Sequence, residues 1–304
     1  MSAKITIAIP SHNNEDVIEE TIQSVLSQEY HNKEILIIDD ASTDNTVNVI
    51  MDLIKKSENR EKFTLIINQE NLGIGKNLEK LMIHARGEYI VYLCADDVFA
   101  NNKVVGDIVD IFEKEKKIGI VGRYFYFFRH GYKGAIGVSR ETDIFIQSCC
   151  PSGMAFRVDK SIVGYNDIFV EMPKIVKQYL NKGYGHTMIK YDTVGARFHP
   201  GGNTGTKKSY YTQSPTKNWI DLVGKEFKSY ETFIMLRNRA TEMLWNEIKI
   251  VFRNNNKCLR DLSFWFYASI AVIFPGWILR PLTNFYRHRI ARRFSKVIER
   301  GYNE

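Results

Sequence analysis

The first third of the chain alternates between two spacings of hydrophobic side chains. Short apolar runs of strand length stand at KITIAIP (residues 4–10), EILIIDD (34–40), FTLIIN (63–68) and YIVYL (89–93). Between these runs, apolar residues recur every three or four positions, which predicts helices up to residue 28, over 46–56 and up to residue 87. Strands that alternate with helices predict a doubly wound α/β sheet, whose ligands bind at the carboxyl ends of the parallel strands.

The chain changes in texture after this part. From IGIVGRYFYFF (118–128) to DIFIQ (143–147) it is aromatic and strand-like, which predicts a mixed second part of the kind expected for a substrate-binding half. A loop rich in glycine, threonine and lysine follows at 197–209, and the pattern beyond it is helical. We therefore predict an α/β domain over residues 1–218 and a helical C-terminal region over 219–304.

Charge separates the same two regions. The formal net charge is +7, and residues 1–218 carry 27 basic and 27 acidic side chains, whereas residues 219–304 carry 15 and 8. A neutral body argues against nucleic acid as a partner, because nucleic-acid-binding domains present a basic surface. A tail that is both basic and apolar favours an anionic membrane surface instead.

The apolar part of the tail is a run of 17 uncharged residues over 263–279, interrupted near its end by Pro275 and Gly276. A spanning helix needs about 20 apolar residues, so this run predicts a helical segment that lies on the membrane surface. Two alternatives remain: the run packs on the protein's own core, or it forms the interface of a homo-oligomer. The N-terminus enters the first strand without a signal peptide, which predicts a cytoplasmic body, peripheral at the inner face of the cell membrane.

Two of the strand-like runs lead into pairs of acids, Asp39-Asp40 and Asp96-Asp97. An acid at such a place can cap the following turn or lie in solvent. Two adjacent buried carboxylates repel each other unless a cation offsets their charge, and Mg²⁺ or Mn²⁺ prefers such oxygen ligands. The second pair therefore predicts a divalent metal site.

Four segments carry a resemblance to a known family. They are AIPSHNNEDVIEETIQSVLSQEY, KEILIIDDASTDNT, NQENLGIGKN and ARGEYIVYLCADDVF, in this order. Together they closely resemble family 2 glycosyltransferases with the GT-A fold, over roughly residues 4–200. The resemblance implies a Rossmann-like nucleotide-binding half joined through a mixed sheet to an acceptor-binding half. It also implies a nucleotide-diphosphate-sugar donor, Mn²⁺ or Mg²⁺, and inversion at the anomeric carbon.

The resemblance assigns the donor site position by position. It implies that the base and ribose pocket is lined by Pro10, Ser11, Asn13 and Glu15. Asp39 is implied to accept the N–H of the base, which favours UDP, although dTDP presents the same edge. Many members meet the diphosphate with an arginine where this chain has Leu78; Lys76 and the backbone of the loop are the alternatives.

The resemblance also assigns the metal site. Many members carry Asp-x-Asp followed by another acid, and here Cys94 takes the leading position. Asp97 is then the implied metal ligand, and Asp96 contacts the ribose or a metal-bound water. Cys94, one of four cysteines without a C-x-x-C spacing, is interpreted as a small packing residue. His199 is a further candidate for metal or phosphate, with a structural histidine as the alternative.

Inverting transfer needs a carboxylate base on the acceptor side. In NDIFVEMPK, alignment of Pro173 with a proline of the family places Glu171 at the position of the base, and Asp167 is the second candidate. Glu171 could equally be an ordinary acid in the first turn of a helix. Ser152 and Gly153 resemble the turn of the family that faces the donor sugar.

These observations predict a metal-dependent inverting glycosyltransferase that moves a sugar from a UDP-sugar to a hydroxyl of a lipid-linked or cell-surface glycan. A sugar nucleotidyltransferase would need a glycine- and arginine-rich phosphate loop after the first strand, which PSHNNED does not provide. The other alternative is a non-catalytic nucleotide-sugar-binding or membrane scaffold protein, because Cys94 and the missing Glu-Asp pair depart from the family pattern.

Overall fold

The computed structural model describes residues 2–129, 137–139, 151–162, 175–176 and 178–198. The chain divides into two compact units, Met1–Thr206 and Lys207–Glu304, and every described residue belongs to the first. The predicted domain boundary at residue 218, the helical C-terminal region and its membrane-surface segment therefore lie outside the described residues. Among the residues that the structure describes, no helix is long and apolar enough to cross a membrane.

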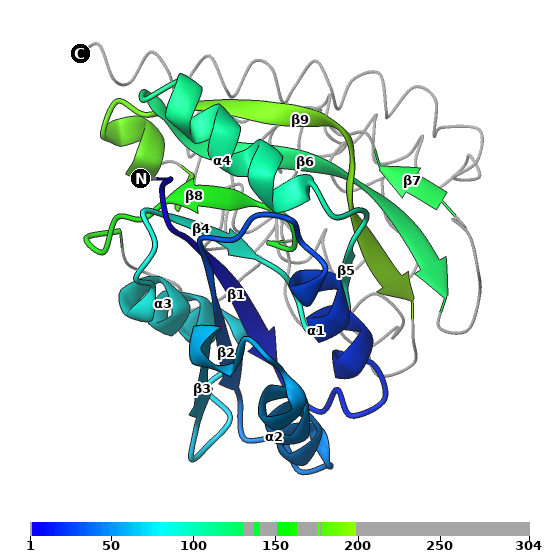
Figure 1. Cartoon of the computed structure of the whole chain (residues 1–304). Coiled ribbons are helices and arrows are strands. Elements are labelled where there is room, and N and C mark those ends of the chain that lie inside the picture. The colour runs from blue at the N-terminus through cyan, green and yellow to red at the C-terminus, as the bar shows by residue number, and fades with distance from the viewer. Residues whose placement is uncertain (1, 130–136, 140–150, 163–174, 177, 199–304) are drawn as a thin grey trace, which may run out of the picture. The chain divides into compact units, whose positions relative to one another are not determined.

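The described strands form one mixed sheet (Figure 1). They are β1 (Ile5–Ser11), β2 (Lys33–Asp39), β3 (Phe63–Ile67), β4 (Tyr89–Tyr92), β5 (Val98–Phe99), β6 (Ile118–Arg129), β7 (Gly137–Ser139), β8 (Ala155–Arg157) and β9 (Gly185–Phe198). Their order is β3-β2-β1-β4-β8-β6-β9-β5, with β7 paired to β6. The strands β3, β2, β1 and β4 are parallel, which confirms the four strands predicted from the first third of the chain.

Helices cover both faces of the parallel strands. They are α1 (Ile18–Leu26), α2 (Thr46–Lys56), α3 (Ile74–His84) and α4 (Val104–Lys114), with a short 3₁₀ turn η1 (Arg60–Lys62). Figure 1 shows α3 on the opposite side of β1 and β2 from α1 and α2. Ile5, Ile7 and Ile9 of β1 belong to the core cluster that includes Ile22 and Val25 of α1, whereas Thr6 and Ala8 alternate to the other face.

The second half of the described sheet is built on two long strands, β6 and β9. β6 pairs antiparallel with β8 and parallel with β9, and β8 pairs antiparallel with β4, which joins the two halves into one sheet. The predicted mixed texture over 118–128 is confirmed as β6, while the DIFIQ segment lies outside the described residues. Helix α4 is not among the predicted elements, although its buried residues recur at helical spacing.

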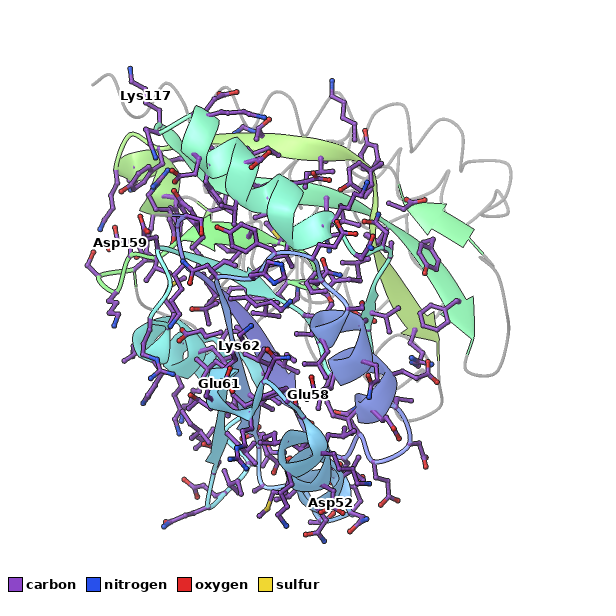
Figure 2. All side chains as sticks on the ribbon, viewed as in Figure 1. Asp52, Glu58, Glu61, Lys62, Lys117 and Asp159 are labelled. Carbon is purple, nitrogen blue, oxygen red and sulfur yellow. The ribbon has the colours of Figure 1, made fainter. Side chains whose placement is uncertain are left out.

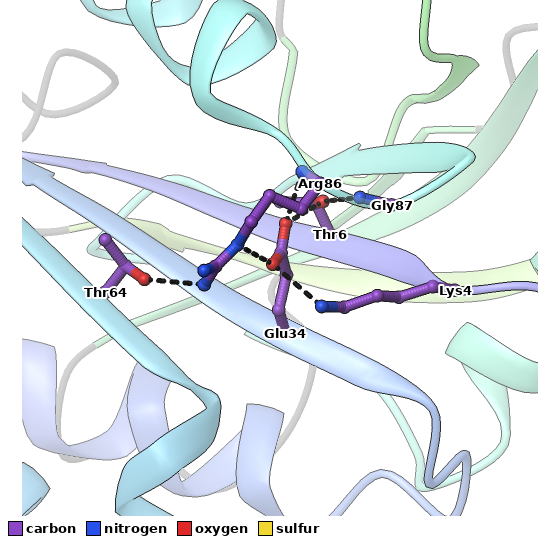
Figure 3. A network of polar contacts seen from close by, with 6 residues as sticks. All are labelled: Lys4, Thr6, Glu34, Thr64, Arg86 and Gly87. Atoms are coloured by element: carbon purple, nitrogen blue, oxygen red, sulfur yellow. Dashed lines mark hydrogen bonds and ion pairs between the residues drawn. The ribbon is translucent and has the colours of Figure 1, made fainter.

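A buried carboxylate ties the amino ends of β1 and β2 to the start of β4 (Figure 3). Glu34 is 4% exposed and forms an ion pair with Arg86 at 2.8 Å and another with Lys4 at 3.1 Å. Its Oε1 also accepts hydrogen bonds from the hydroxyl of Thr6 and the backbone N–H of Arg86, each at 2.6 Å. The Thr6 hydroxyl in turn accepts from the Gly87 N–H at 3.0 Å. This network fixes the strands whose opposite ends carry the candidate site.

The surface around α2 is charged with both signs (Figure 2). Asp52 projects from the helix, and Glu58, Glu61 and Lys62 follow it on the way to β3 (Figure 2). Lys117 and Asp159 lie at the other end of this unit, away from the carboxyl ends of β1 and β2 (Figure 2).

Candidate active site

The loops after β1 and β2 are bonded to each other at the carboxyl edge of the sheet. The backbone N–H of Asn13 donates to the hydroxyl of Ser42 at 2.9 Å, and the Asn13 side-chain oxygen accepts from the N–H of Thr43 at 2.8 Å. Glu15 accepts from the backbone N–H of Asn45 at 2.7 Å. The structure thus brings Asn13 and Glu15 together with the loop after Asp39, and the Ser11 carbonyl accepts from the N–H of Asp40 at 2.8 Å; their role as a nucleotide pocket stays a prediction.

The backbone at this edge adopts conformations that side chains usually avoid. Asn13 has φ 53° and Ala41 has φ 56°, both in the left-handed region. Asparagine tolerates this region, whereas alanine pays a steric penalty from its Cβ. Such strained residues often lie at functional sites, because the surrounding contacts hold them in a geometry that the chain would not choose.

The two aspartates of the first acid pair, Asp39 and Asp40, bind different partners. Asp39 is fully buried, and its carboxylate accepts from the N–H and the hydroxyl of Ser42, at 2.9 and 2.5 Å. It therefore caps its own turn, and a base N–H would have to share this carboxylate with Ser42 or displace the Ser42 hydroxyl.

Asp40 points to the loop before α3 instead. Its carboxylate accepts from the backbone N–H of Leu72 at 2.8 Å, from that of Gly73 at 2.9 Å, and from the Asn68 side chain at 2.9 Å. Burial acts to raise the pKa of Asp40, but hydrogen bonds from Asn77, Leu72, Asn68 and Gly73 outweigh it and hold that pKa below its usual range. Asp40 thus orders the start of α3, whose first turn carries the exposed Lys76.

Residues Cys94–Asp97, which we call the acid turn, form a tight turn directly after β4. The N–H of Asp97 donates to the carbonyl of Cys94 at 3.0 Å, which closes the turn. Neighbouring elements hold its backbone: the Ala95 N–H donates to the carbonyl of Pro10 at 3.2 Å, and the Thr21 hydroxyl donates to the carbonyl of Ala95 at 2.9 Å. The acid turn is therefore anchored to β1 and α1 before any ligand binds.

Asp97 is the buried acid of the acid turn. It is 6% exposed and accepts from the N–H of Arg197 at 2.9 Å. Burial, and then the neighbouring Asp96 carboxylate, raise the pKa of Asp97 to about 8, although hydrogen bonds from Ser152 and Arg197 act to lower it. A carboxyl in this situation gains from a cation that favours its ionised form. The buried carboxylate of Asp97 and the partly exposed one of Asp96, whose oxygens lie within 4.8 Å of each other, therefore fit Mn²⁺ or Mg²⁺, both of which prefer oxygen ligands.

Cys94 differs from its predicted role. Its side chain is partly exposed rather than part of the core, and its sulfur and the carboxylate oxygens of Asp96 and Asp97 lie within 4.8 Å of one another. The N–H of Cys94 donates to the hydroxyl of Ser152 at 3.1 Å. Cys94 is therefore not a core residue, and its sulfur lies beside the carboxylates of Asp96 and Asp97.

Arg197 was missed by the sequence analysis. It lies in β9 with its side chain 1% exposed, and its Nε donates to the backbone carbonyl of Asp96 at 2.8 Å. Its Nη2 forms an ion pair with Glu20 of α1 at 2.8 Å, and the guanidinium lies 4.6 Å from the ring centre of Phe128. Arg197 therefore binds the backbone of the acid turn and connects that turn to α1 and β6. The only signal of its role in the sequence is its position two residues before the candidate His199.

Ser152 and Gly153 lie next to the acid turn, where the Ser152 hydroxyl accepts from the N–H of Cys94. Ser152 is 1% exposed, and its carbonyl accepts from Nε of Arg123 at 2.6 Å. Gly153 has φ +80°, and a Cβ there would lie 2.4 Å from Cγ2 of Val194. Only glycine fits this position, because both the conformation and the contact exclude a side chain.

Three predicted site residues lie outside the described part of the chain. They are Asp167, Glu171 and His199. A further residue that the sequence analysis passed over, His12, lies at the carboxyl edge, with Nδ1 2.9 Å from the carbonyl of Asp40 and Nε2 3.2 Å from the side-chain nitrogen of Asn71.

Comparison with known families decides the membership of the chain. The family model described as glycosyl transferase family 2 matches residues 6–211, which is more than half of the sequence. The chain belongs to glycosyl transferase family 2. This agrees with the family resemblance of the four sequence segments, and the matched range contains the acid turn and both loops of the carboxyl edge.

Relatives and solved structures agree with this membership. The putative teichuronic acid biosynthesis glycosyltransferase TuaG of Bacillus subtilis is 29% identical over 118 residues, which are 39% of this chain and 46% of that protein. The structure of S. aureus TarS 1-349 in complex with UDP-GlcNAc matches with TM-score 0.54 and 16% identity, over 99% of this chain and 91% of that one. The mannosyltransferase PcManGT from Pyrobaculum calidifontis, in complex with GDP-Man and Mn²⁺, matches with TM-score 0.53 and 15% identity over 99% and 85%. The structural matches show that the fold is GT-A-like.

The chain spans less than half the length of the curated relatives that it matches, 40% of one and 46% of another. The range matched by the family model, residues 6–211, contains the carboxyl edge, so the family membership concerns the candidate site itself.

Proposed function

We propose that this protein is a metal-dependent, inverting glycosyltransferase that moves a sugar from a UDP-sugar to a hydroxyl of a lipid-linked or cell-surface glycan. The observation that carries this proposal is the acid turn. In this turn the buried Asp97, whose pKa is raised, stands next to Asp96. The turn follows β4 at the carboxyl ends of the parallel strands, which is where α/β sheets of this kind bind nucleotides. Family membership supports the reaction class, and the other features below support the roles of individual residues.

The nucleotide is proposed to lie over the carboxyl ends of β1 and β2. Pro10, Ser11, Asn13 and Glu15 would surround the base and ribose. Asp39 would accept the imide N–H of uracil, sharing its carboxylate with Ser42. Lys76, exposed in the first turn of α3, would meet the diphosphate, helped by the positive end of the helix.

Asp97 is proposed as the direct ligand of Mn²⁺ or Mg²⁺, with Asp96 contacting the ribose or a metal-bound water and His199 as a further candidate. When bound, the cation would stabilise the negative charge that the diphosphate acquires as it leaves. The chain's part is to hold both carboxylates in place before the donor arrives. The contacts of Arg197, Thr21 and Ser152 with the acid turn serve that purpose.

Glu171 is proposed as the base that takes the proton of the acceptor hydroxyl, with Asp167 as the second candidate. A single displacement then inverts the anomeric carbon, because the acceptor attacks from the face opposite to the leaving diphosphate. Glutamate at this position reaches one methylene further than aspartate.

The acceptor class is proposed from location and from relatives. The basic, apolar C-terminal region would place the enzyme at the inner face of the cell membrane, where lipid-linked glycans are confined. The relative TuaG, named as a putative teichuronic acid biosynthesis glycosyltransferase, supports the proposal of a cell-surface glycan.

The test is release of UDP from a panel of UDP-sugars by the full chain, with Mn²⁺ or Mg²⁺ and with a membrane extract as the acceptor source. Asp97→Asn and Glu171→Gln are each expected to lower the rate by about 100-fold or more. Asp110→Asn removes an exposed acid of α4 with a side chain 67% exposed, and serves as the matched control with an unchanged rate. UDP release that is independent of metal and of Asp97 would refute the proposal, and binding without turnover would favour the scaffold alternative.

A further inference from the structure

The acid turn brings a thiol to the same point as its two carboxylates. Cys94 forms no disulfide, and its sulfur and the ligand oxygens of Asp96 and Asp97 all lie within 4.8 Å of one another. Two donors bound to one ion at roughly 2.0–2.3 Å are at most about 4.6 Å apart, so rotation of these side chains could bring all three donors onto one cation. The sulfur is therefore placed to meet any cation that the two carboxylates hold.

Hydrogen bonds of the Cys94 backbone restrict the position of its thiol. The Cys94 N–H is bound to Ser152, and its carbonyl accepts from the Asp97 N–H. Ser152 is itself held by Arg123 from β6. Since both ends of the Cys94 peptide are held in this way, the thiol has little freedom except rotation about its own Cα–Cβ bond.

Sulfur changes which cation the site prefers. Mg²⁺ takes oxygen ligands almost exclusively, whereas thiolate ligands favour softer divalent ions such as Zn²⁺, Co²⁺ and Cd²⁺. An acid in place of Cys94 would give an all-oxygen site. A cysteine there gives a mixed oxygen and sulfur site on the same turn.

We propose that Cys94 is the third protein donor of the metal site, and that it makes the site selective for thiophilic divalent cations over Mg²⁺. Binding through sulfur replaces the S–H bond by a metal–sulfur bond and releases the proton to solvent. This inference rests on the metal site of the proposed function and specifies the class of cation that it takes.

The test is titration of the metal-free full chain with Co²⁺, followed by optical absorption. A sulfur-to-cobalt charge-transfer band in the near ultraviolet appears only when a thiolate binds the ion. Cys149, Cys150 and Cys258 are the other cysteines of the chain, so a triple variant with serine at these three positions leaves Cys94 as the sole thiol. Equilibrium dialysis measures bound Co²⁺ independently of the band.

We expect the band in the wild type and in the triple variant, and its loss in Cys94→Ser. Cys94→Ser is also expected to weaken Cd²⁺ binding by roughly tenfold or more while leaving Mg²⁺ binding within about twofold. Cys94→Ala repeats the comparison if the serine variant folds poorly, and the triple variant answers the question without any change at Cys94.

Absence of the band in the triple variant overturns the inference, whether or not dialysis finds bound Co²⁺, and so does a band of equal intensity in Cys94→Ser. Release of UDP from UDP-sugars is measured on the same preparations. Metal-dependent release without a sulfur band would sink the role of Cys94 and leave the proposed function standing. A sulfur band without release of UDP from any UDP-sugar would support the role of Cys94 and contradict the proposed function.

Discussion

Replacement of Glu34 by glutamine tests how the amino ends of the central strands are held. Glutamine keeps the shape of the side chain but removes its charge, and its NH₂ group would face donors where Glu34 Oε2 now accepts from Arg86 and pairs with Lys4. A hydrogen bond to a charged group contributes about 1.5–3 kcal/mol, so we expect a loss of about 2 kcal/mol at pH 7. For a unit of this size, that corresponds to a fall in Tm of about 4–8 °C.

The effect has a defined pH dependence. Burial acts to raise the pKa of Glu34, but hydrogen bonds from Thr6, Arg86 and Lys4 outweigh it, so the folded-state pKa lies below the ordinary value of 4.5. A lowered pKa means that the carboxylate stabilises the folded state fully above the unfolded-state pKa and loses this contribution as the pH falls through the folded-state pKa. The gap between wild type and Glu34→Gln should therefore be constant between about pH 6 and 8 and shrink below about pH 4.5.

The assay is denaturant and thermal unfolding of the full chain, followed by circular dichroism at several pH values between about 3.5 and 8. Glu58→Gln, at an exposed acid after α2, is the matched control and should stay within about 0.5 kcal/mol of the wild type (Figure 2). A Glu34→Gln variant as stable as this control, or a gap that persists unchanged at the lowest pH, would refute the reasoning.

Three further predictions concern the site. Arg197→Lys cannot reach both the Asp96 carbonyl and Glu20, so we expect the fold to be kept and Mn²⁺ affinity, measured by calorimetry, to fall about tenfold; an unchanged affinity would show that Arg197 does not position the acid turn. The folded-state pKa of Asp97, raised to about 8, lies above the ordinary value of 3.8, so the metal-free protein should lose stability as pH rises between these values. The rise in Tm on adding Mn²⁺ should then be larger at pH 8 than at pH 6, and equal rises would contradict the raised pKa. Ala41→Gly relieves the left-handed backbone at φ 56° and should stabilise the protein by about 1 kcal/mol in denaturant unfolding, whereas a destabilised variant would show that Ala41 is not strained.

The parallel half of the fold could be predicted from the sequence because its signals are local. Apolar runs of strand length, separated by helical spacing, gave β1, β2, β3 and β4, and the structure confirms the predicted bounds of α2 as Thr46–Lys56. The acid turn was predicted for the same reason, since it directly follows a buried strand. Parallel strands bring their carboxyl ends to one edge, so the acid pairs that follow β2 and β4 can be placed at that edge without any knowledge of distant contacts.

What the sequence did not reveal depends on contacts between distant residues. Arg197 meets Asp97 across 100 positions of the chain, and Thr21 meets Ala95 across 74. No periodicity marks such pairs, because the first arises from the return of β9 beside β6 and β5 and the second from the packing of α1 against the acid turn. The exposure of Cys94 was missed for a related reason: a cysteine at a strand end usually packs, and only the turn geometry directs its sulfur to the carboxylates.

The most direct measurement is the binding of UDP to the full chain by isothermal titration calorimetry, with Mn²⁺ present and with EDTA, for the wild type and Asp97→Asn. We predict that UDP binds the wild type with Mn²⁺ and that either EDTA or Asp97→Asn weakens this binding by about 100-fold, because the metal joins the diphosphate to the acid turn. Equal binding of UDP under all of these conditions would contradict the placement of a metal-dependent donor site at the acid turn.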